Sequence, residues 1–290
     1  MALPTRVLGK TGASVSVLGL GTGAFGFGKV PHEYGVAMVR RALELGVTYF
    51  DTAHHYESES MVGEGLVGHR DRVFLATKTV KRNRAGAWSD VKLSLKQLRT
   101  DRVDLMMIHC VNTLGDLDAV TGPGGSLEAI VEAQKEGLVR FVGITGHARP
   151  NILALALERF PFDAVMSALG AMDALVTAPQ IFLVPAVQRA GCGLVAMKVL
   201  GDGALGAHES LAIRYALGLG AHVVSVGVRS IEEVEKAAAA AADPRPLSSD
   251  EEATLMAAAR ELVHGRQNEA YWFNDPEVTA YRRGWIGAKR

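Results

Sequence analysis

Short apolar runs alternate with longer amphipathic stretches along most of the chain. The short runs are rich in β-branched and other apolar residues, and the longer stretches repeat apolar residues at the helical period. Near-continuous apolar runs of this length are typical of parallel strands that helices cover. We predict strands at residues 18–22, 47–51, 73–78, 103–109, 139–145, 163–167, 193–198 and 222–227.

The stretches between these runs predict helices. Residues 33–45 follow Pro31 and end before Gly46, and residues 126–136 end before Gly137. Proline before a helix and glycine after it is the usual arrangement at helix ends. Eight strands that alternate with helices predict the α/β class and, within it, a (β/α)8 TIM barrel. The remaining predicted helices are 88–99, 151–159, 179–190, 207–217 and 231–242.

No shift in composition marks a domain boundary, so we predict a single domain over residues 1–290. Residues 1–17 precede the first strand and predict a small hairpin that caps the floor of the barrel, which spans 18–242. In the segment 243–290, an extra helix at 248–264 begins with a capping-box pattern. The aromatic tail that follows either packs against the outside of the barrel or forms a lid over its mouth.

Composition limits the classes of partner and the location that we expect. The 31 Lys and Arg residues balance 31 Asp and Glu residues, whereas a nucleic-acid-binding surface usually needs a basic excess. Cys110 and Cys192 are too few for a disulfide framework, which favours a reducing cytoplasm. The pattern of a signal peptide is missing from the first residues, and apolar stretches are too short to span a membrane. We expect a cytoplasmic protein that binds neither nucleic acid nor a membrane.

Two glycine patterns after the first strand resemble nucleotide-binding motifs but lack their structural context. Residues 21–26 match G-x-G-x-x-G, but Pro31 places the next helix too late for its N-terminus to face a pyrophosphate. Residues 23–29 nearly match a P-loop, but Val30 stands where a Ser or Thr must hold Mg²⁺. We therefore interpret this segment as a flexible loop at the top of the first strand.

Four polar residues follow apolar runs in the first half of the chain. Asp51, Lys78 and His109 end the second, third and fourth predicted strands, and Tyr56 lies in the loop after the second. The carboxyl ends of barrel strands share one mouth, where barrel enzymes place their active sites. Charged groups are rarely buried unpaired, so a shared site explains the four residues better than separate solvated or core positions do.

These four side chains suit the donation of a proton to a carbonyl oxygen. A Lys ammonium favours the phenolate of a neighbouring Tyr and lowers its pKa below the ordinary value of about 10. An Asp holds that ammonium in place, and a His orients the substrate oxygen. Because no side chain supplies hydride, the set implies a nicotinamide cofactor and a small-molecule carbonyl substrate.

Two other functions stay open on the residues alone. A nucleotide-binding barrel with little catalysis would act as a redox sensor or bind a partner protein, and a test of hydride turnover separates it from a reductase. A metal-dependent hydrolase would need ligands at several strand ends, whereas His54 and His55 are adjacent and point to opposite sides of an extended chain. We therefore predict no metal site.

A set of short sequence stretches accompanies these four residues. They are Tyr49-Phe-Asp-Thr-Ala53 with Tyr56, Ser58-Glu59 before Gly63, Ala76-Thr-Lys78, Ser94-Leu-Lys-Gln-Leu98, Asp101-Arg-Val-Asp-Leu105, Ile108-His109 and Glu136-Gly-Leu-Val-Arg-Phe-Val-Gly143. Together they resemble the aldo-keto reductase superfamily over about residues 5–240. The resemblance implies reduction of an aldehyde or ketone by NADPH, or the reverse oxidation. It also implies Tyr56 as the general acid, Lys78 and Asp51 as the groups that tune it, and His109 as the residue that orients the substrate.

The resemblance implies cofactor contacts after several further strands. Arg229 and Ser230 stand where a ribose 2′-phosphate would bind, which favours NADP over NAD. Near Gly170 the aromatic residue that the family stacks on the nicotinamide is missing. Residues 196–198, Ala-Met-Lys, match a branch whose members often carry a C-terminal iron–sulfur domain, but two cysteines cannot ligate a cluster. The full set of cofactor candidates is Thr22, Gly23, Asp51, Thr145, Gly146, Ser167, Lys198, Leu200, Gly201, Gly203, Gly227, Arg229, Ser230 and Glu233.

Substrate contacts are expected from residues around the same mouth. We predict that Phe25, His55, His109 and His147 contact the substrate. Specificity is expected to depend on the loops at 22–32 and 110–125 and on the aromatic tail, because loops on this scaffold vary without changing the fold.

Overall fold

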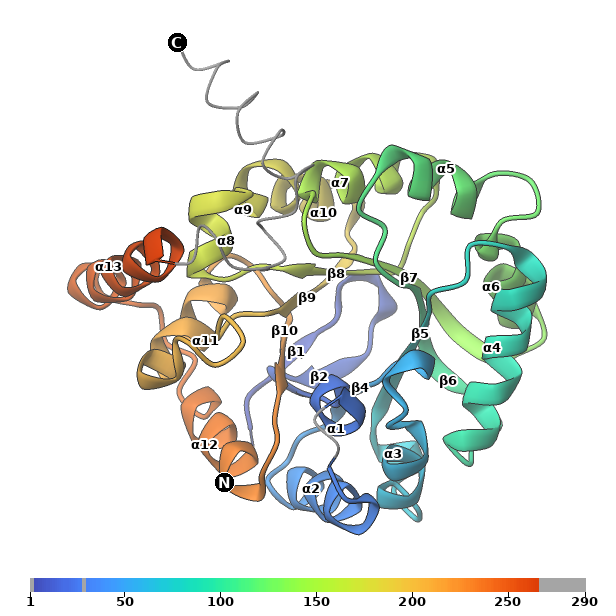
Figure 1. Cartoon of the computed structure of the whole chain (residues 1–290), viewed down its shortest axis with the longest axis horizontal. Helices are drawn as coiled ribbons and strands as arrows, with labels where there is room; N and C mark the ends of the chain where they lie inside the picture. The colour runs from blue at the N-terminus through green and yellow to red at the C-terminus, as the bar shows by residue number, and fades with distance from the viewer. Residues whose placement is uncertain (1–2, 28–29, 266–290) are drawn as a thin grey trace.

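The computed structural model describes residues 3–27 and 30–265, and its centre is a closed barrel of eight parallel strands (Figure 1). The strands follow one another around the barrel in chain order, and the last pairs with the first. Such closure leaves no strand edge exposed within the barrel. The barrel strands are β3 (Leu18–Gly21), β4 (Tyr49–Asp51), β5 (Phe74–Thr79), β6 (Val103–Ile108), β7 (Val139–Gly146), β8 (Ala164–Ala168), β9 (Gly193–Met197) and β10 (Val223–Gly227).

Helices surround the barrel and cover the outer faces of its strands (Figure 1). Their apolar sides and the outward side chains of the strands form one large buried cluster, which makes up most of the core. The helices are α1 (Gly23–Phe27), α2 (His32–Glu44), α3 (Glu59–Gly65), α4 (Arg84–Gln97), α5 (Leu114–Thr121), α6 (Ser126–Lys135), α7 (Pro150–Arg159), α8 (Ala171–Val176), α9 (Pro179–Phe182), α10 (Val184–Ala190), α11 (Glu209–Gly218), α12 (Ile231–Ala241) and α13 (Ser249–Gly265).

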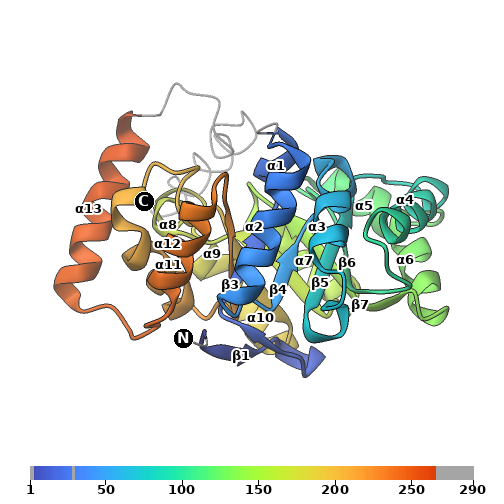
Figure 2. The same cartoon turned by 90° about the horizontal axis from the view of Figure 1, so that it is seen from below.

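A two-stranded antiparallel sheet closes the floor of the barrel. Its strands β1 (Thr5–Val7) and β2 (Ser14–Ser16) are joined by the 3-10 turn η1 (Gly9–Thr11). Figure 2 shows this hairpin at one end of the barrel and α1 at the other. Gly9 has φ +50°, and a Cβ there would lie 2.4 Å from the backbone nitrogen of Gly193, so only glycine lets the turn meet the start of β9.

Large side chains fill the barrel interior above this floor. Tyr49 stacks on Phe74 with ring centres 5.5 Å apart, and Phe74 stacks on Phe141 at 6.0 Å. Leu8 of the hairpin and Met107 of β6 belong to the same buried cluster. The lower part of the barrel is therefore a packed core, and a cavity lies toward the carboxyl ends of the strands.

The eight predicted strands and the predicted hairpin are confirmed, with strand ends shifted by one or two residues. The predicted helix at 179–190 is instead two helices, α9 and α10, because Pro185 lacks an N–H and cannot continue the first of them. The predicted helix at 248–264 is present as α13, and the aromatic tail lies outside the described residues.

The interpretation of the segment after the first strand as a flexible loop is wrong for its first half. Gly23–Phe27 forms α1, whose start is fixed by a hydrogen bond from the Phe25 N–H to the Thr22 carbonyl, 3.0 Å. Glycines at positions 23 and 26 lower the helix propensity of this segment, so the sequence did not predict a helix there. The sequence also gave no strong signal for the short helices α3, α5 and α8.

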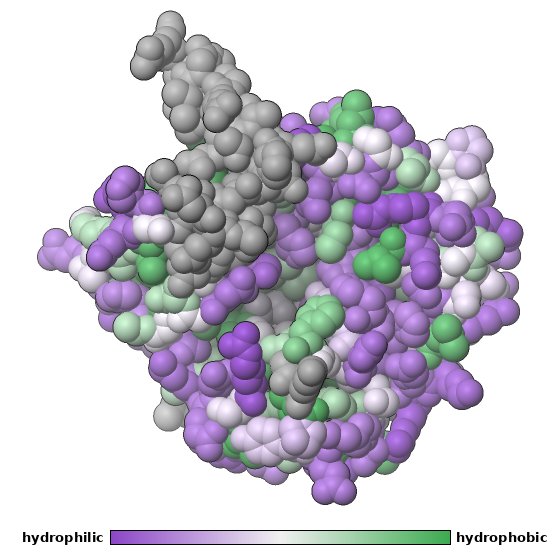
Figure 3. All heavy atoms as spheres, viewed as in Figure 1, coloured by the Kyte–Doolittle hydropathy of each residue, from purple (hydrophilic) through white to green (hydrophobic). Residues whose placement is uncertain are grey.

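The surface around the barrel mouth is mainly hydrophilic. Seen from the direction of Figure 1, purple residues cover most of this face and green ones are scattered in small groups (Figure 3). Within residues 3–27 and 30–265, every helix is too short or too polar to cross a membrane.

Candidate active site

The buried ion pair of Lys78 and Asp51 lies at the carboxyl ends of β5 and β4. These strands pair in register, and both side chains project to the same side of the sheet. The Lys78 ammonium donates to Asp51 Oδ2 at 2.7 Å and to the Thr52 carbonyl at 2.8 Å, and it has no exposed surface. The other oxygen of Asp51 is buried without a hydrogen-bond partner among the described residues.

Tyr56 is held over this pair by the 3-10 turn η2 (His54–Tyr56). Its hydroxyl lies 3.4 Å from His109 Nε2, and the Lys78 ammonium lies 4.9 Å from the centre of its ring. Helix α1 packs directly on the turn: a Cβ at Gly26 would lie 1.6 Å from the Tyr56 carbonyl oxygen. The structure therefore brings the four sequence-predicted residues into one cluster.

The electrostatics of Tyr56 differ from the sequence-based expectation. Burial raises the pKa of the Tyr56 hydroxyl, and this effect outweighs the lowering by the Lys78 ammonium. The net direction is thus upward, whereas we predicted a lowered pKa. The physical reason is that the phenolate loses more hydration in the cavity than one paired ammonium restores, since Asp51 already balances the charge of Lys78. Tyr56 is a neutral phenol in this state.

Lys78 stays charged, whereas His109 stays neutral. Burial alone would lower the pKa of Lys78, but the Asp51 carboxylate reverses this and raises it. Burial lowers the pKa of His109 well below its ordinary value, and the nearby Lys78 adds to the effect. A neutral imidazole has one donor and one acceptor nitrogen, as a residue that orients a carbonyl oxygen requires.

Two buried carboxylates, Glu59 and Asp90, accept hydrogen bonds from the threonines on either side of Lys78 in the chain. Glu59, which has no exposed surface, accepts from Thr77 Oγ1 at 2.6 Å and pairs with His54 Nδ1 at 3.1 Å. Asp90 accepts from Thr79 Oγ1 at 2.6 Å. The bond to Glu59 raises the pKa of His54. From the sequence, Glu59 was identified only as part of a stretch that resembles the family. Asp90 was not predicted, because its hydrogen-bond partner Thr79 lies 11 residues away in the chain.

A cavity of about 640 Å³ opens from this cluster and crosses the mouth of the barrel. Asp51, Tyr56 and His109 line it. It also extends to the start of α12, where Arg229 is exposed and donates its backbone N–H to Glu233 at 2.7 Å. A volume in this range is usual for small-molecule and cofactor sites.

Two lysines outside the cluster around Tyr56 also line the cavity, and each pairs with an acidic side chain. Lys198 pairs with Asp202 at 3.0 Å, and Lys236 pairs with Glu209 at 3.3 Å. Burial raises the pKa of Glu209, although Lys236 opposes this. The cations and their acidic partners all line the cavity, so this region is rich in charge without a large net charge.

Eight of the predicted cofactor residues line the cavity. They are Gly23, Asp51, Lys198, Leu200, Gly203, Gly227, Arg229 and Glu233. The other six, Thr22, Thr145, Gly146, Ser167, Gly201 and Ser230, are not among the lining residues.

The hydroxyl groups in that second set are engaged within the protein. The Thr22 hydroxyl donates to the Asp51 carbonyl at 3.0 Å, and Thr145 Oγ1 accepts from the Cys110 N–H at 3.1 Å. Ser167 donates to a neighbouring carbonyl, and Ser230 caps α12 by accepting from the Glu233 N–H. These bonds fix the walls of the site, and because a hydroxyl that donates can still accept and one that accepts can still donate, they are compatible with a further contact to a ligand.

Three of the four predicted substrate residues line the cavity: His55, His109 and His147. Phe25 does not, because α1 turns its side chain into the core, where it has no exposed surface. Phe27, two residues later, lines the cavity instead and is 65% exposed. Its ring lies 5.5 Å from that of Tyr56 and 5.8 Å from that of His55.

The cavity also contains residues that sequence reasoning missed. Met166 and Met197 line it from β8 and β9, and Cys110 lines it beside His109. Met166 and Met197 follow apolar residues within strands, so their pattern is that of a core side chain. Only their inward register, which is visible once the strands are paired, places them in the cavity.

The comparison with known proteins decides the family. The model of the "Aldo/keto reductase family" matches residues 17–211, which is well over half of the chain. This chain belongs to the aldo/keto reductase family. The matched residues contain all four members of the cluster around Tyr56 and the loop after β9 that borders the cavity.

Curated relatives and solved structures in the family cover different shares of the chain. L-galactose dehydrogenase of Arabidopsis thaliana is 32% identical over 219 residues, which are 69% of this chain and 66% of that protein. Methylglyoxal reductase DkgB of Salmonella typhi is 36% identical over 134 residues, 44% of this chain and 49% of that protein. The chain thus spans about half to two thirds of the length of these relatives.

A solved structure aligns over more of the fold. The holo form of the aldo-keto reductase AKR11C1 from Bacillus halodurans superposes with a TM-score of 0.72 at 25% identity. The alignment covers 90% of this chain and 96% of that one. The (β/α)8 architecture of this chain is therefore that of the aldo/keto reductase family.

Proposed function

We propose that this protein is an NADPH-dependent oxidoreductase that reduces a small aldehyde or ketone, or catalyses the reverse oxidation. One observation carries the proposal: the cluster around Tyr56 meets a cavity that Lys198, Lys236 and Arg229 also line. Proton donation and cofactor binding require these two environments side by side. The names of the relatives include both a reductase and a dehydrogenase, which agrees with a reversible reaction.

The residues present fit a dinucleotide cofactor. Positions 203, 206 and 227 line the cavity, and an added Cβ at any of them would meet no atom within 4 Å. The glycines therefore leave open backbone that a pyrophosphate can approach. Lys198, Lys236 and Arg229 supply positive charge in the same cavity. Arg229 at the rim is the group that we assign to the 2′-phosphate, because a guanidinium pairs with two phosphate oxygens at once.

When bound, the nicotinamide supplies hydride to the carbonyl carbon. The remaining steps belong to this chain. The Tyr56 hydroxyl donates its proton to the carbonyl oxygen, which becomes the alcohol. The phenolate that is left is stabilised by the Lys78 ammonium, whose position is fixed by Asp51 and the Thr52 carbonyl. His109, neutral and 3.4 Å from the Tyr56 hydroxyl, holds the same oxygen in reach by a hydrogen bond.

The lining around Tyr56 supports a small carbonyl substrate. The ring centres of Phe27 and His55 lie 5.5 and 4.7 Å from that of Tyr56, and the ring centre of His147 lies 6.0 Å from that of His109. These side chains offer apolar surface and a few hydrogen-bonding nitrogens. An uncharged carbonyl compound fits such a lining without the desolvation of a second charge.

The test is turnover across a panel of aldehydes and ketones. We expect carbonyl-dependent oxidation of NADPH with formation of the alcohol, and the reverse reaction with the alcohol and NADP⁺. The panel separates an enzyme from a barrel that binds nucleotide but catalyses little. Tight NADPH binding without turnover in either direction would contradict the proposed function.

A further inference from the structure

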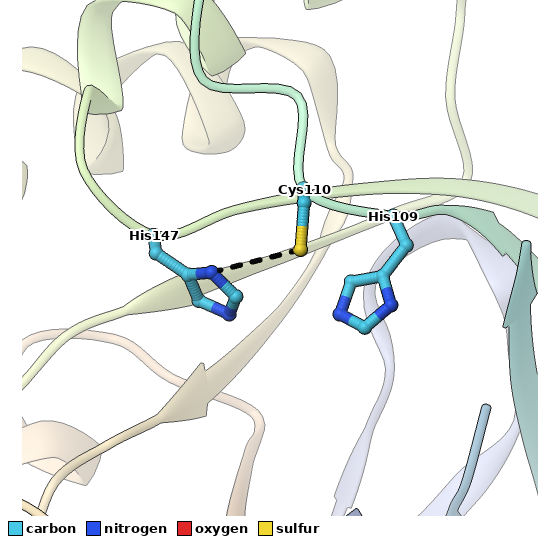
Figure 4. A group of neighbouring side chains, drawn as sticks. All are labelled: His109, Cys110 and His147. Atoms are coloured by element: carbon cyan, nitrogen blue, oxygen red, sulfur yellow. Dashed lines mark hydrogen bonds between the residues drawn. The ribbon is translucent and has the colours of Figure 1, made fainter. Parts of the chain in front are cut away.

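Two histidines and a cysteine meet beside the proton-donating cluster. Figure 4 shows His109 and Cys110, which follow β6, and His147, which follows β7, with the sulfur between the two rings. Each residue offers one ligand atom, and these atoms all lie within 4.8 Å of one another. Cys110 Sγ is 3.7 Å from His147 Nδ1. All three side chains line the cavity, so space remains beside them for a further ligand.

The backbone on both sides fixes this arrangement. Cys110 has φ +58°, a conformation that costs energy for a residue with a Cβ. Its N–H donates to Thr145 Oγ1 at 3.1 Å, and its carbonyl accepts from Arg82 at 2.8 Å. The His147 N–H donates to Asn112 Oδ1 at 2.8 Å. Because three hydrogen bonds hold the two residues, their side chains face each other before any ligand arrives.

The separations agree with those between ligands of a tetrahedral zinc ion. Zn–S and Zn–N bonds of about 2.3 and 2.1 Å place a sulfur and a nitrogen about 3.6 Å apart at the tetrahedral angle. The pair of Cys110 and His147 already has this spacing within a few tenths of an ångström. All three ligand atoms lie within 4.8 Å of one another, so the His109 nitrogen must approach the other two by about 1 Å to complete a tetrahedral set.

Charges around the three residues are compensated. The cations that face them are Lys78, Arg82 and Lys198, and each has an acidic partner: Asp51 at 2.7 Å, Asp116 at 3.1 Å and Asp202 at 3.0 Å. A divalent cation that also takes up a cysteine thiolate adds one net positive charge to this neutral surrounding.

We propose that His109, Cys110 and His147 bind one zinc-class divalent cation, and that this ion inhibits the enzyme by occupying the place of the carbonyl oxygen. Two imidazoles and a thiolate match the ligand preference of Zn²⁺, with water from the cavity as the fourth ligand. Binding converts the Cys110 thiol to a thiolate and releases its proton to solvent. The inhibitory part rests on the proposed function, because it requires His109 to orient the substrate; the binding part does not.

The binding test uses Zn²⁺ and the full chain without a cofactor. Equilibrium dialysis with metal analysis should give one Zn²⁺ per chain in the wild type, and Cys110→Ser should weaken binding by about 100-fold, since a thiolate ligand is lost. Cys192→Ser is the matched control, because Cys192 is buried directly before β9 and is not among the residues that line the cavity. It should bind Zn²⁺ like the wild type. Equal binding by the wild type and Cys110→Ser would overturn the proposal.

A spectroscopic test checks the ligand itself. Co²⁺ in place of Zn²⁺ should give a sulfur-to-cobalt charge-transfer band in the wild type and in Cys192→Ser, and the band should be lost in Cys110→Ser. His147→Gln should keep the band but weaken Co²⁺ binding. A band that survives in Cys110→Ser would contradict the assignment.

The inhibition test follows turnover at increasing Zn²⁺. Inhibition should be competitive with the carbonyl substrate, and it should be lost together with Zn²⁺ binding in Cys110→Ser. Cysteine-dependent Zn²⁺ binding in a protein that turns over no carbonyl would support the metal site and contradict the proposed function. Turnover that Zn²⁺ does not affect, in a protein that binds the ion, would overturn the inhibitory role.

Discussion

At the scale of residues, the ion pair of Lys78 and Asp51 has an unfavourable desolvation energy and also positions an ammonium beside Tyr56. Both groups are buried, so each would be expensive without the other. Their positions were visible in the sequence, because a charged residue at the end of an apolar strand needs a partner at a neighbouring strand end. The upward shift of the Tyr56 pKa could not be predicted from the sequence, because it depends on how much water the folded site excludes from the hydroxyl.

Removal of the ammonium alone should destabilise the protein strongly. Lys78→Met leaves Asp51 buried without its partner, and we expect a loss of about 3–5 kcal/mol in the free energy of unfolding. The double variant Lys78→Met with Asp51→Asn removes both charges and should recover part of that loss. Urea denaturation of the two variants measures the difference. If the double variant were no more stable than the single one, the pair would not be the cause.

Arg229 and Glu233, which line the cavity at the start of α12, should affect the binding of NADPH more than that of NADH. Arg229→Ala should weaken NADPH binding by about tenfold or more, because a charge-assisted phosphate contact is lost, and should leave NADH binding nearly unchanged. Glu233→Gln removes a negative charge from the same rim but keeps an oxygen for the Arg229 N–H, so it should tighten NADPH binding. Fluorescence titration with both cofactors is the measurement. Equal effects on NADPH and NADH would contradict the assigned 2′-phosphate contact.

At the scale of elements, long periodic segments were predictable and short ones were not. The eight strands follow from short, near-continuous apolar runs, because they are buried on both faces, and the long helices follow from apolar residues at the helical period, because each buries one face. Helix α1 depends instead on a contact distant in sequence, the backbone of η2, and two of its five residues are glycine. For the same reason Phe27 rather than Phe25 lines the cavity: the direction of a side chain on a five-residue helix depends on what the helix packs against.

The contact between α1 and η2 should control the position of Tyr56. A Cβ at Gly26 would overlap the Tyr56 carbonyl, so Gly26→Ala must displace one element from the other. We expect kcat to fall by about 100-fold while the barrel stays folded, because a shift of about 1 Å in a reacting group has effects of this size. Gly218→Ala is the control, since a Cβ there meets nothing within 4 Å. Circular dichroism and steady-state kinetics compare the two; normal kcat in Gly26→Ala would contradict this role.

At the scale of the whole molecule, the barrel places around its mouth two histidines whose pKa values shift in opposite directions. Burial lowers the pKa of His147 to about 4, whereas the bond to Glu59 raises the pKa of His54. Between pH 6.5 and 4 the unfolded chain protonates at position 147 and the folded chain does not. His147 therefore contributes stability above pH 6.5 that is lost as the pH falls toward 4. His54 contributes stability at low pH that is lost as the pH rises through its folded pKa.

Two variants should separate these contributions. His147→Gln should reduce the loss of unfolding free energy between pH 6.5 and 4 by about 2 kcal/mol. His54→Gln should make the loss steeper, because it removes a group that binds protons more tightly in the folded state. Urea denaturation across this pH range measures both. Parallel pH profiles for the wild type and His147→Gln would show that His147 is not buried in its neutral form.

Transfer of label from cofactor to product tests the role of Tyr56 most sharply. With NADPH that carries deuterium at the transferring position and an aldehyde substrate, the wild type should form an alcohol with one deuterium on the former carbonyl carbon. Tyr56→Phe should bind NADPH as the wild type does, because the hydroxyl contacts the substrate oxygen, yet form labelled alcohol about 1,000-fold more slowly. Labelled product at the wild-type rate from Tyr56→Phe, or alcohol without deuterium from the wild type, would contradict the assigned chemistry.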